Sequence, residues 1–152
     1  MYASSMSDTT MTDQKQIVQE SEHEAWNEGN VDAYDEVYST EYVLHSPLGD
    51  QELADVKETI EAVRAGNADF EFAIMDVVGE GNKVVLRYTM AGTNTGPSLL
   101  TEEPTGKSWE ASGISIYRFE DGTIIEQWDN FDYLSVLQQL GQIPSDPTES
   151  SQ

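Results

Sequence analysis

Cysteine is absent from this sequence, and basic residues are scarce. The lack of cysteine excludes disulfide bonds, thiolate nucleophiles and cysteine-ligated metal sites. Only seven Lys and Arg residues stand against 29 Asp and Glu residues, which gives a formal net charge of −22. Because nucleic acids and anionic membrane surfaces are bound through basic patches, we expect no nucleic acid and no membrane among the partners.

Long apolar runs are also missing. No stretch approaches the ~20 apolar residues needed to cross a bilayer, and residues 1–8 have neither the basic region nor the apolar segment of a secretory signal. We therefore expect a cytoplasmic protein. A length of 152 residues suits one domain. We predict a domain over residues 12–143, preceded by a disordered segment at 1–11 and followed by a flexible polar tail at 144–152.

The acidic residues are spread along the whole chain and are not collected in one block. This distribution is typical of proteins adapted to molar salt, in which charge repulsion is screened within ~3 Å. The sequence therefore indicates a halophilic protein, and an acidic protein from ordinary salt is the alternative.

Apolar spacing predicts helices in the first half of the chain and strands in the second. Helices are expected over residues 13–27, just after Asn30, and over 52–65, with a brief strand at 42–45. Strands are predicted by β-branched and aromatic residues over 70–78, 83–91, 108–119 and 123–131, before a helix over 132–140. Such an order describes an α+β cone, in which a bent antiparallel sheet follows the helices and one helix closes the chain.

The loop at residues 119–123 decides which side chains of the last two strands share a face. A two-residue loop at Asp121-Gly122 pairs Ser115 with Trp128, whereas a three-residue loop pairs Ser115 with Gln127. We prefer the three-residue loop, because it sorts polar and aromatic residues from apolar ones. One face then suits a pocket lining and holds Gly113, Ser115, Tyr117, Ile125, Gln127, Asp129 and Phe131. The apolar face predicts a homodimer and holds Ile114, Ile116, Ile124 and Trp128.

Asp129 is the best candidate for a catalytic residue. It lies on a strand rich in Trp and Phe, where a carboxylate is costly unless it is used or paired. Aromatic neighbours should raise its pKa, so that it could exchange protons with a carbon acid or a hydroxyl near neutral pH. The alternative is a surface Asp in a very acidic protein.

Other residues are expected to form the pocket around Asp129. Four of them share its face of the sheet and two come from elsewhere: Ser115, Gln127, Tyr117 and Phe131, with Trp26 and His45. His45 could carry a proton, and a structural histidine is the alternative. Two widely separated histidines give no metal-ligand spacing, and no phosphate loop or Gly-x-Ser-x-Gly elbow occurs. We therefore expect neither a metal nor a cofactor.

Three segments carry a family resemblance: residues 25–30, residues 104–107 and, above all, residues 117–141. They are similar to SnoaL-like proteins, the polyketide cyclase-like branch of the superfamily that includes nuclear transport factor 2 and ketosteroid isomerase. The resemblance implies a cone-shaped curved sheet wrapped around N-terminal helices. It also implies that Asp129 takes the place of the Asp that serves as acid and base in aldol ring closure. Those cyclases carry a His where this chain has Ser115, and a hydroxyl cannot shuttle protons at neutral pH as imidazole does.

These features together predict a cofactor-free enzyme acting on a small apolar carbonyl compound, by cyclisation, isomerisation or hydration. A non-catalytic small-ligand-binding module of the same fold is the competing prediction. A third is a structural dimer with a filled cavity, since one fold hosts many functions.

The charge balance makes folding dependent on salt. Repulsion among the acidic residues opposes compaction, and added salt screens it. We expect cooperative thermal unfolding in molar KCl to be lost as the KCl concentration falls below roughly 0.5 M. Thermal melts in KCl steps measure this, and a Tm that is insensitive to salt would contradict the halophilic interpretation.

Overall fold

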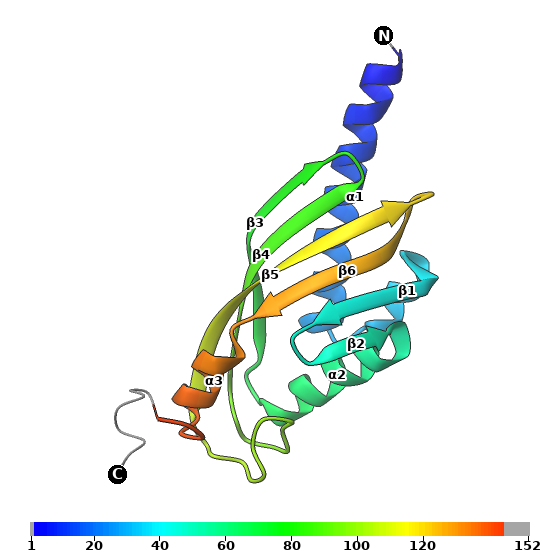
Figure 1. Cartoon of the computed structure of the whole chain (residues 1–152). Helices are drawn as coiled ribbons and strands as arrows, with labels where there is room; N and C mark the ends of the chain where they lie inside the picture. Colours follow the sequence, from blue (N-terminus) through cyan, green and yellow to red (C-terminus); the bar gives the residue numbers. More distant parts are fainter. Residues whose placement is uncertain (1, 145–152) are drawn as a thin grey trace.

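The computed structural model describes residues 2–144, with side chains from residue 10 onward. Two helical segments precede a hairpin, and a further helix, four long strands and a last helix follow (Figure 1). The elements are α1 (Tyr2–Trp26), the 3-10 helix η1 (Val31–Glu36), β1 (Tyr38–Ser46), β2 (Gly49–Glu52), α2 (Leu53–Gly66), β3 (Glu71–Glu80), β4 (Lys83–Thr93), β5 (Ser108–Glu120), β6 (Thr123–Phe131) and α3 (Tyr133–Gln139).

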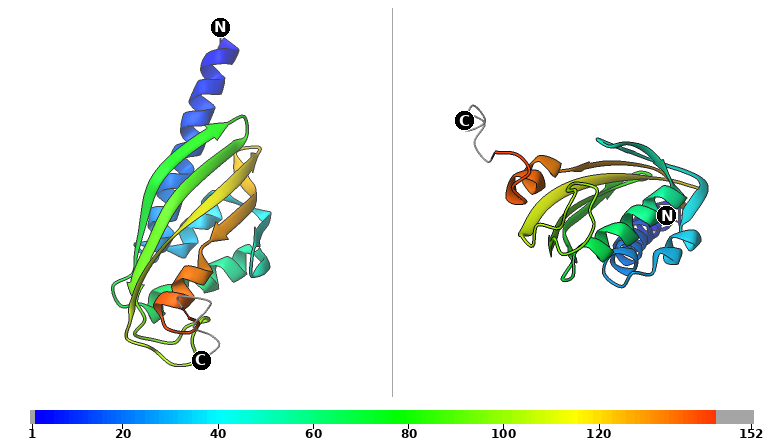
Figure 2. Two further views of the ribbon diagram at one scale, coloured as in Figure 1. Left: turned by 60° about the vertical axis from the view of Figure 1, so that its left-hand side comes forward. Right: turned by 90° about the horizontal axis from the view of Figure 1, so that it is seen from below.

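The six strands form one curved sheet in the order β2-β1-β6-β5-β4-β3. Helices α1, η1 and α2 lie inside its curve, and α3 follows β6 at one end (Figures 1 and 2). The predicted α+β cone is confirmed. The sheet is nevertheless mixed, because β1 runs parallel to β6 while the other neighbours are antiparallel. After β2 the chain crosses through α2 to the far edge of the sheet and returns strand by strand, so that β6 arrives beside β1 in the same direction.

Local sequence explains where the helices begin. Helix α2 starts with a capping box, in which the Glu52 backbone N–H donates to the Asp55 carboxylate at 3.0 Å. Asp132 accepts a hydrogen bond from the Ser135 backbone N–H at 3.0 Å and caps α3. Helix α1 begins at Tyr2, before the residue 13 that apolar spacing indicated. Its first turns are mostly polar and give that spacing little to register.

The structure describes the chain near the first predicted domain boundary and little of the chain beyond the second. The backbone is helical over most of the segment 1–11 for which we expected disorder. The polar tail predicted over 144–152 lies outside the described residues except for its first residue. The domain over 12–143 therefore remains a prediction at both ends. No helix in the described part of the chain is long and apolar enough to cross a membrane.

A row of aromatic rings runs from α1 across the inner face of the sheet to β6. Trp26 stacks on Phe72 with ring centroids 6.0 Å apart. Phe72 stacks on Tyr88 at 5.1 Å, and Tyr88 stacks on Phe131 at 6.3 Å. Because such contacts add to the gain from burial, this row fixes the helix layer against β3, β4 and β6.

The β5–β6 hairpin has neither of the two predicted registers. Its turn is the two-residue loop, because Glu120 pairs with Thr123 and the two residues between them have positive φ, 53° at Asp121 and 83° at Gly122. Such angles are typical of a tight turn whose twist matches the strands. A bulge then shifts the register by one residue, so that Ser115 pairs with Asp129. The preferred three-residue loop and its pairings were therefore wrong.

The bulge nevertheless restores the predicted faces beyond it. Ser115, Gln127 and Asp129 all point to the helix side of the sheet, while Ile114, Ile116 and Trp128 lie on the outer side. Ile125 is the extra residue of the bulge. Ile124 precedes it and is fully buried in the core, which corrects its predicted place on the outer face. A shift of one residue exchanges the faces of a strand. Ser115 pairs with Asp129 and not with the expected Gln127, which is a shift of two residues, so the faces stay as predicted.

Candidate functional site

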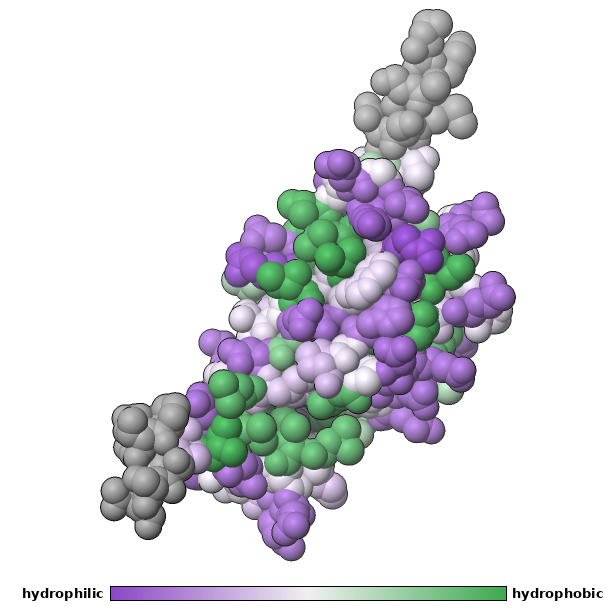
Figure 3. All heavy atoms as spheres, in the orientation of Figure 1, coloured by the Kyte–Doolittle hydropathy of each residue, from purple (hydrophilic) through white to green (hydrophobic). Residues whose placement is uncertain are grey.

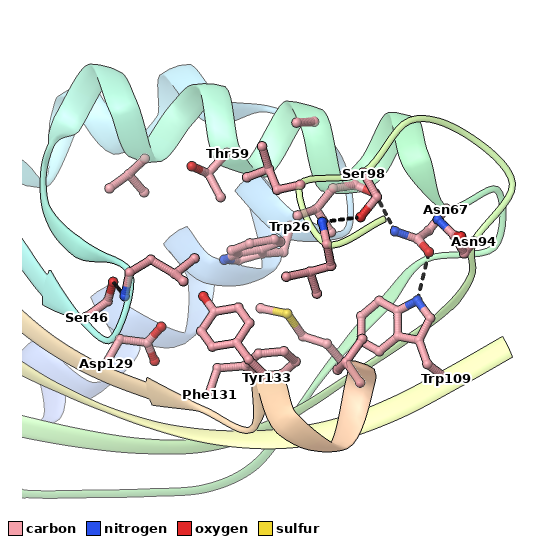
Figure 4. A pocket seen from close by; sticks show the side chains of 18 of the residues that line it. Trp26, Ser46, Thr59, Asn67, Asn94, Ser98, Trp109, Asp129, Phe131 and Tyr133 are labelled. Atoms are coloured by element: carbon pink, nitrogen blue, oxygen red, sulfur yellow. Dashed lines mark hydrogen bonds between the residues drawn. The ribbon is translucent and has the colours of Figure 1, made fainter. Parts of the chain in front are cut away.

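A cavity of about 320 Å³ lies between the inner face of the sheet, α2, α3 and the loop that follows β4. Its wall is mainly aromatic and aliphatic and includes Trp26, Leu44, Val63, Met90, Trp109, Phe131 and Val136. Polar groups gather at two ends (Figure 4). One end holds Asp129, and the other holds Asn67 and Asn94.

Asp129 is held in place through one of its two carboxylate oxygens. The Tyr88 hydroxyl donates to Asp129 Oδ1 at 2.7 Å, and the Ser115 hydroxyl donates to the same oxygen at 2.8 Å. Neither bond uses Oδ2. The carboxylate is thus oriented by two neutral donors from β4 and β5, and its second oxygen is left for a ligand.

Burial raises the pKa of Asp129 above its ordinary value, and the hydrogen bonds from Tyr88 and Ser115 oppose this by favouring the charged form. No cation takes part in either bond. The carboxylate therefore binds a proton more readily than an exposed Asp, as a group that removes and returns a proton must.

A second layer of hydrogen bonds supports Ser115. Gln127 Nε2 donates to the Ser115 hydroxyl at 3.4 Å, and the Tyr42 hydroxyl donates to Gln127 Oε1 at 2.6 Å. All three side chains are buried. These hydrogen bonds, which run from β1 through β6 to β5, thus fix the position of the Ser115 hydroxyl, which in turn orients Asp129.

Gly113 lets Tyr88 reach Asp129. The Tyr88 ring lies over β5 at this glycine, where an added Cβ would stand 2.5 Å from Tyr88 Cζ. A carbon side chain at residue 113 would push the ring away from its present position. Glycine is therefore required here by close approach, since its φ is ordinary.

The structure brings together most of the predicted site residues. Asp129, Phe131 and Trp26 line the cavity. Ser115 and Gln127 lie directly behind Asp129 and do not line the cavity. They are therefore supporting residues instead of the pocket lining that the shared face suggested.

Tyr117 and His45 lie away from the cavity, which corrects their predicted places in its lining. Tyr117 is fully buried and donates to Glu22. His45 points to the outer side of the sheet, because Leu44 before it points inward. Its ring hydrogen-bonds to Asp50 at 2.9 Å and to Glu126 at 2.7 Å, and these partners raise its pKa.

Glu22 is a buried carboxylate that sequence reasoning missed. It lies on α1 and is only 4% exposed. Its two oxygens accept hydrogen bonds from the hydroxyls of Tyr34 and Tyr117. Its acidic neighbours Glu20 and Glu24 are typical of a solvated helix face and give no sign of burial. Its spacing of four residues from both Val18 and Trp26 was the available signal, since that spacing places it on the inward stripe.

Two tyrosines of the cavity were also missed. Tyr88 and Tyr133 both line it, and Tyr88 bonds directly to Asp129. Strand alternation predicts that Tyr88 points inward. It gives no sign that the ring borders open space. Over the described residues, no group of three or more His, Asp and Glu side chains is placed to hold a metal.

A family model for SnoaL-like polyketide cyclase matches residues 16–140. The chain belongs to this family. The SnoaL-like resemblance of residues 117–141 is thereby confirmed. No curated protein sequence matches the chain significantly.

Solved structures agree with the SnoaL-like assignment. AclR, a proposed hydroxylase from Streptomyces galilaeus, is 25% identical, with a TM-score of 0.77 over 88% of this chain and 99% of that chain. TsrD from Streptomyces laurentii is 28% identical, with a TM-score of 0.77 over 86% of this chain and 96% of that one. A proposed polyketide cyclase from Acidithiobacillus ferrooxidans is 31% identical, with a TM-score of 0.72 over 86% and 95%. Two of these relatives carry different activities in their names, hydroxylase and polyketide cyclase, so the reaction has to be argued from the site.

Glu22 should make stability depend on pH. Burial raises its pKa from 4.5 to about 7, with the charge of Asp129 adding to the shift and the two tyrosine hydroxyls opposing it. The folded state therefore favours the protonated form. Its contribution to stability is complete below pH 4.5 and is lost as the pH rises towards 7. Over this window the free energy of unfolding of the wild type should fall by about 3 kcal/mol relative to Glu22→Gln.

Urea unfolding of both proteins at fixed salt, at steps between pH 4 and pH 8, measures this difference. Glu20→Gln removes the same charge from an exposed position on the same helix and is the control for net charge. A difference between wild type and Glu22→Gln that does not change with pH would show that Glu22 ionises as easily in the folded as in the unfolded chain.

Proposed function

We propose that this SnoaL-like protein is a cofactor-free enzyme that transfers protons on a small, apolar carbonyl compound, with Asp129 as acid and base. One observation carries the proposal: Asp129 lies in the wall of a mostly apolar cavity, with Oδ1 fixed by two hydroxyls. A carboxylate in such surroundings is desolvated, oriented and able to bind a proton.

The site supports a single group that takes a proton and gives it back. Tyr88 and Ser115 hold Oδ1, so the other oxygen faces the substrate and can accept a proton from the carbon beside a carbonyl group. Ser115 stands where related cyclases carry His and has no imidazole to share the work. Asp129 would therefore return the same proton, either to another carbon or to the oxygen formed by ring closure.

The wall of the cavity favours a neutral ligand. No Lys, Arg or His lines it in the described part of the chain, so an anionic ligand would find no counter-charge beside Asp129. Aromatic rings on several sides suit a flat, apolar molecule. Among cyclisation, isomerisation and hydration, the family name favours cyclisation.

A non-catalytic binding module is the second candidate. The hydrogen bonds from Tyr88 and Ser115 lower the pKa of Asp129 against the effect of burial, and a carboxylate kept charged in this way would simply accept a hydrogen bond from a ligand hydroxyl. The same residues would then serve recognition alone.

The outer face of the sheet supports a homodimer as part of this proposal. Val78, Val85, Ile116 and Trp128 are successive cross-strand neighbours and form a row from β3 to β6. Ile114 beside this row is 49% exposed. Hydrophobic side chains gather on this side of the molecule between hydrophilic ones (Figure 3). A second copy related by two-fold symmetry would present the same row, and each copy would then cover the apolar row of the other.

Replacing Asp129 by Asn separates the two candidate functions. Asn keeps the shape and removes the proton chemistry. For an enzyme, we expect turnover of a carbonyl substrate to be abolished while ligand affinity stays within about tenfold, a difference of roughly 1.4 kcal/mol. Steady-state kinetics and direct binding measure the two effects. For a binding module, affinity alone should change.

Asp121→Asn is the control for this change, because it removes the same charge from the exposed β5–β6 turn at a position where Asn tolerates the positive φ. Turnover that survives Asp129→Asn unchanged would remove Asp129 from the reaction.

Trp128→Glu tests the homodimer. A carboxylate at the β6 end of the apolar row would be desolvated at a symmetric interface, so we expect this variant to be monomeric where the wild type is dimeric. Light scattering in high salt measures the mass. Leu134→Glu places the same charge on α3, at a residue that is 59% exposed, and should leave the dimer intact. A monomeric wild type would refute this interface.

A further inference from the structure

We propose that the Tyr133 hydroxyl donates a hydrogen bond to the carbonyl oxygen of the substrate while Asp129 takes the proton from the neighbouring carbon. This inference rests on the proposed function and assigns it a second catalytic residue. It starts from the position of Tyr133 at the junction of β6 and α3, two residues beyond Phe131.

The Tyr133 ring is held firmly at this junction. Asp132 caps α3 and fixes its first turn. Phe131 packs edge to face against Tyr133, with ring centroids 5.1 Å apart and planes at 81°. Both residues line the cavity, as Asp129 does (Figure 4). The backbone and the ring contact thus place the phenol on the same wall as the carboxylate.

The hydroxyl of Tyr133 is free to bind a ligand. It makes no hydrogen bond with any residue in the described part of the chain, although it borders the cavity. The other described tyrosines differ from it. Four donate to carboxylate or amide oxygens of other side chains, namely Tyr34, Tyr42, Tyr88 and Tyr117. Tyr38 also lacks a partner, but it does not line the cavity.

The electrostatics of the site keep Tyr133 protonated. Burial raises its pKa to about 12, and the charge of Asp129 contributes to the increase. Near neutral pH the phenol is therefore a donor, while the nearby carboxylate is the acceptor. A donor and an acceptor on one wall match the two atoms of a carbonyl compound that change charge, the oxygen and the hydrogen on the adjacent carbon.

The reaction step balances with these two residues. Asp129 Oδ2 takes the proton, the electrons of the C–H bond form a carbon–carbon double bond, and the carbonyl π electrons move to oxygen. The resulting enolate oxygen receives the Tyr133 hydrogen bond. Removing one such donor from an enzyme lowers kcat by about 10²–10³-fold. Tyr133→Phe should therefore reduce turnover to this extent with little change in the affinity for an uncharged ligand.

Binding of an enolate mimic tests the donor without any turnover. The probe is 4-nitrophenolate, a flat anion whose charge is shared between the phenolate oxygen and the nitro group, and nitrobenzene is its neutral counterpart without the phenolate oxygen. Both are titrated into Asp129→Asn, which mimics the carboxyl after it has taken the proton, and into the same protein with Tyr133→Phe added. A hydrogen bond to a charged group contributes about 1.5–3 kcal/mol, so loss of Tyr133 should weaken 4-nitrophenolate binding by about 10–100-fold. Nitrobenzene binding should change less than about threefold.

Three results would overturn the proposal. Equal weakening of both probes would make Tyr133 a part of the wall only. Unchanged 4-nitrophenolate binding would show that no hydrogen bond is donated, and failure of Asp129→Asn to bind the anion at all would show the same. Circular dichroism and tryptophan fluorescence check that Tyr133→Phe, which keeps the ring, remains folded.

The outcome is separable from that of the proposed function. A wild-type protein without turnover, together with selective weakening of 4-nitrophenolate by Tyr133→Phe, would refute the enzyme and leave Tyr133 as a ligand-binding donor. Turnover that depends on Asp129 but not on Tyr133 would refute the donor and leave the acid/base proposal standing.

Discussion

Tyrosine hydroxyls hold two carboxylates inside this molecule, and much of the interior is arranged around that interaction. Tyr88 from β4 bonds to Asp129, while Tyr34 and Tyr117 bond to Glu22. A buried carboxylate without a partner would be expensive, yet a cationic partner would fix its charge. Neutral phenols satisfy the oxygens and still allow the carboxyl group to be protonated. In so acidic a protein, this choice leaves one titratable group in the wall of the cavity, Asp129, and another in the core, Glu22.

The charge of Asp129 also reaches Glu22. It adds to the burial that raises the pKa of Glu22, whereas the raised pKa of Asp129 comes from the burial of Asp129 itself. Protonation of Asp129 would therefore ease the ionisation of Glu22 on α1, although Glu22 does not line the cavity.

Periodicity predicted the fold class, most element positions and the face on which Asp129 lies, because period and face are local properties of a strand. It failed on the register of β5 and β6, since a bulge depends on packing between strands and not on either strand alone. Tyr88 and Tyr133 could be predicted to point inward or near the core. Whether a ring borders packed atoms or open space depends on side chains from several other elements, and no local pattern carries that information. His45 was predicted to line the pocket because of its residue type. Alternation along β1 is a local pattern, and it places His45 on the outer side of the sheet.

The parallel pairing of β1 with β6 sets an order of events for a growing chain. Leu44 and Gln127 are partners across this pair, so β1 and its hairpin cannot join the sheet until the chain has been synthesised as far as β6. The cavity is closed by the same step, because Leu44 and Ser46 line one side of it and Asp129 and Phe131 another. Contacts so distant in sequence form slowly, and a nascent chain that lacks β6 exposes the apolar edge of its unfinished pocket. Closure of the cavity and completion of the sheet are thus a single event, which cannot occur before β6 has been synthesised.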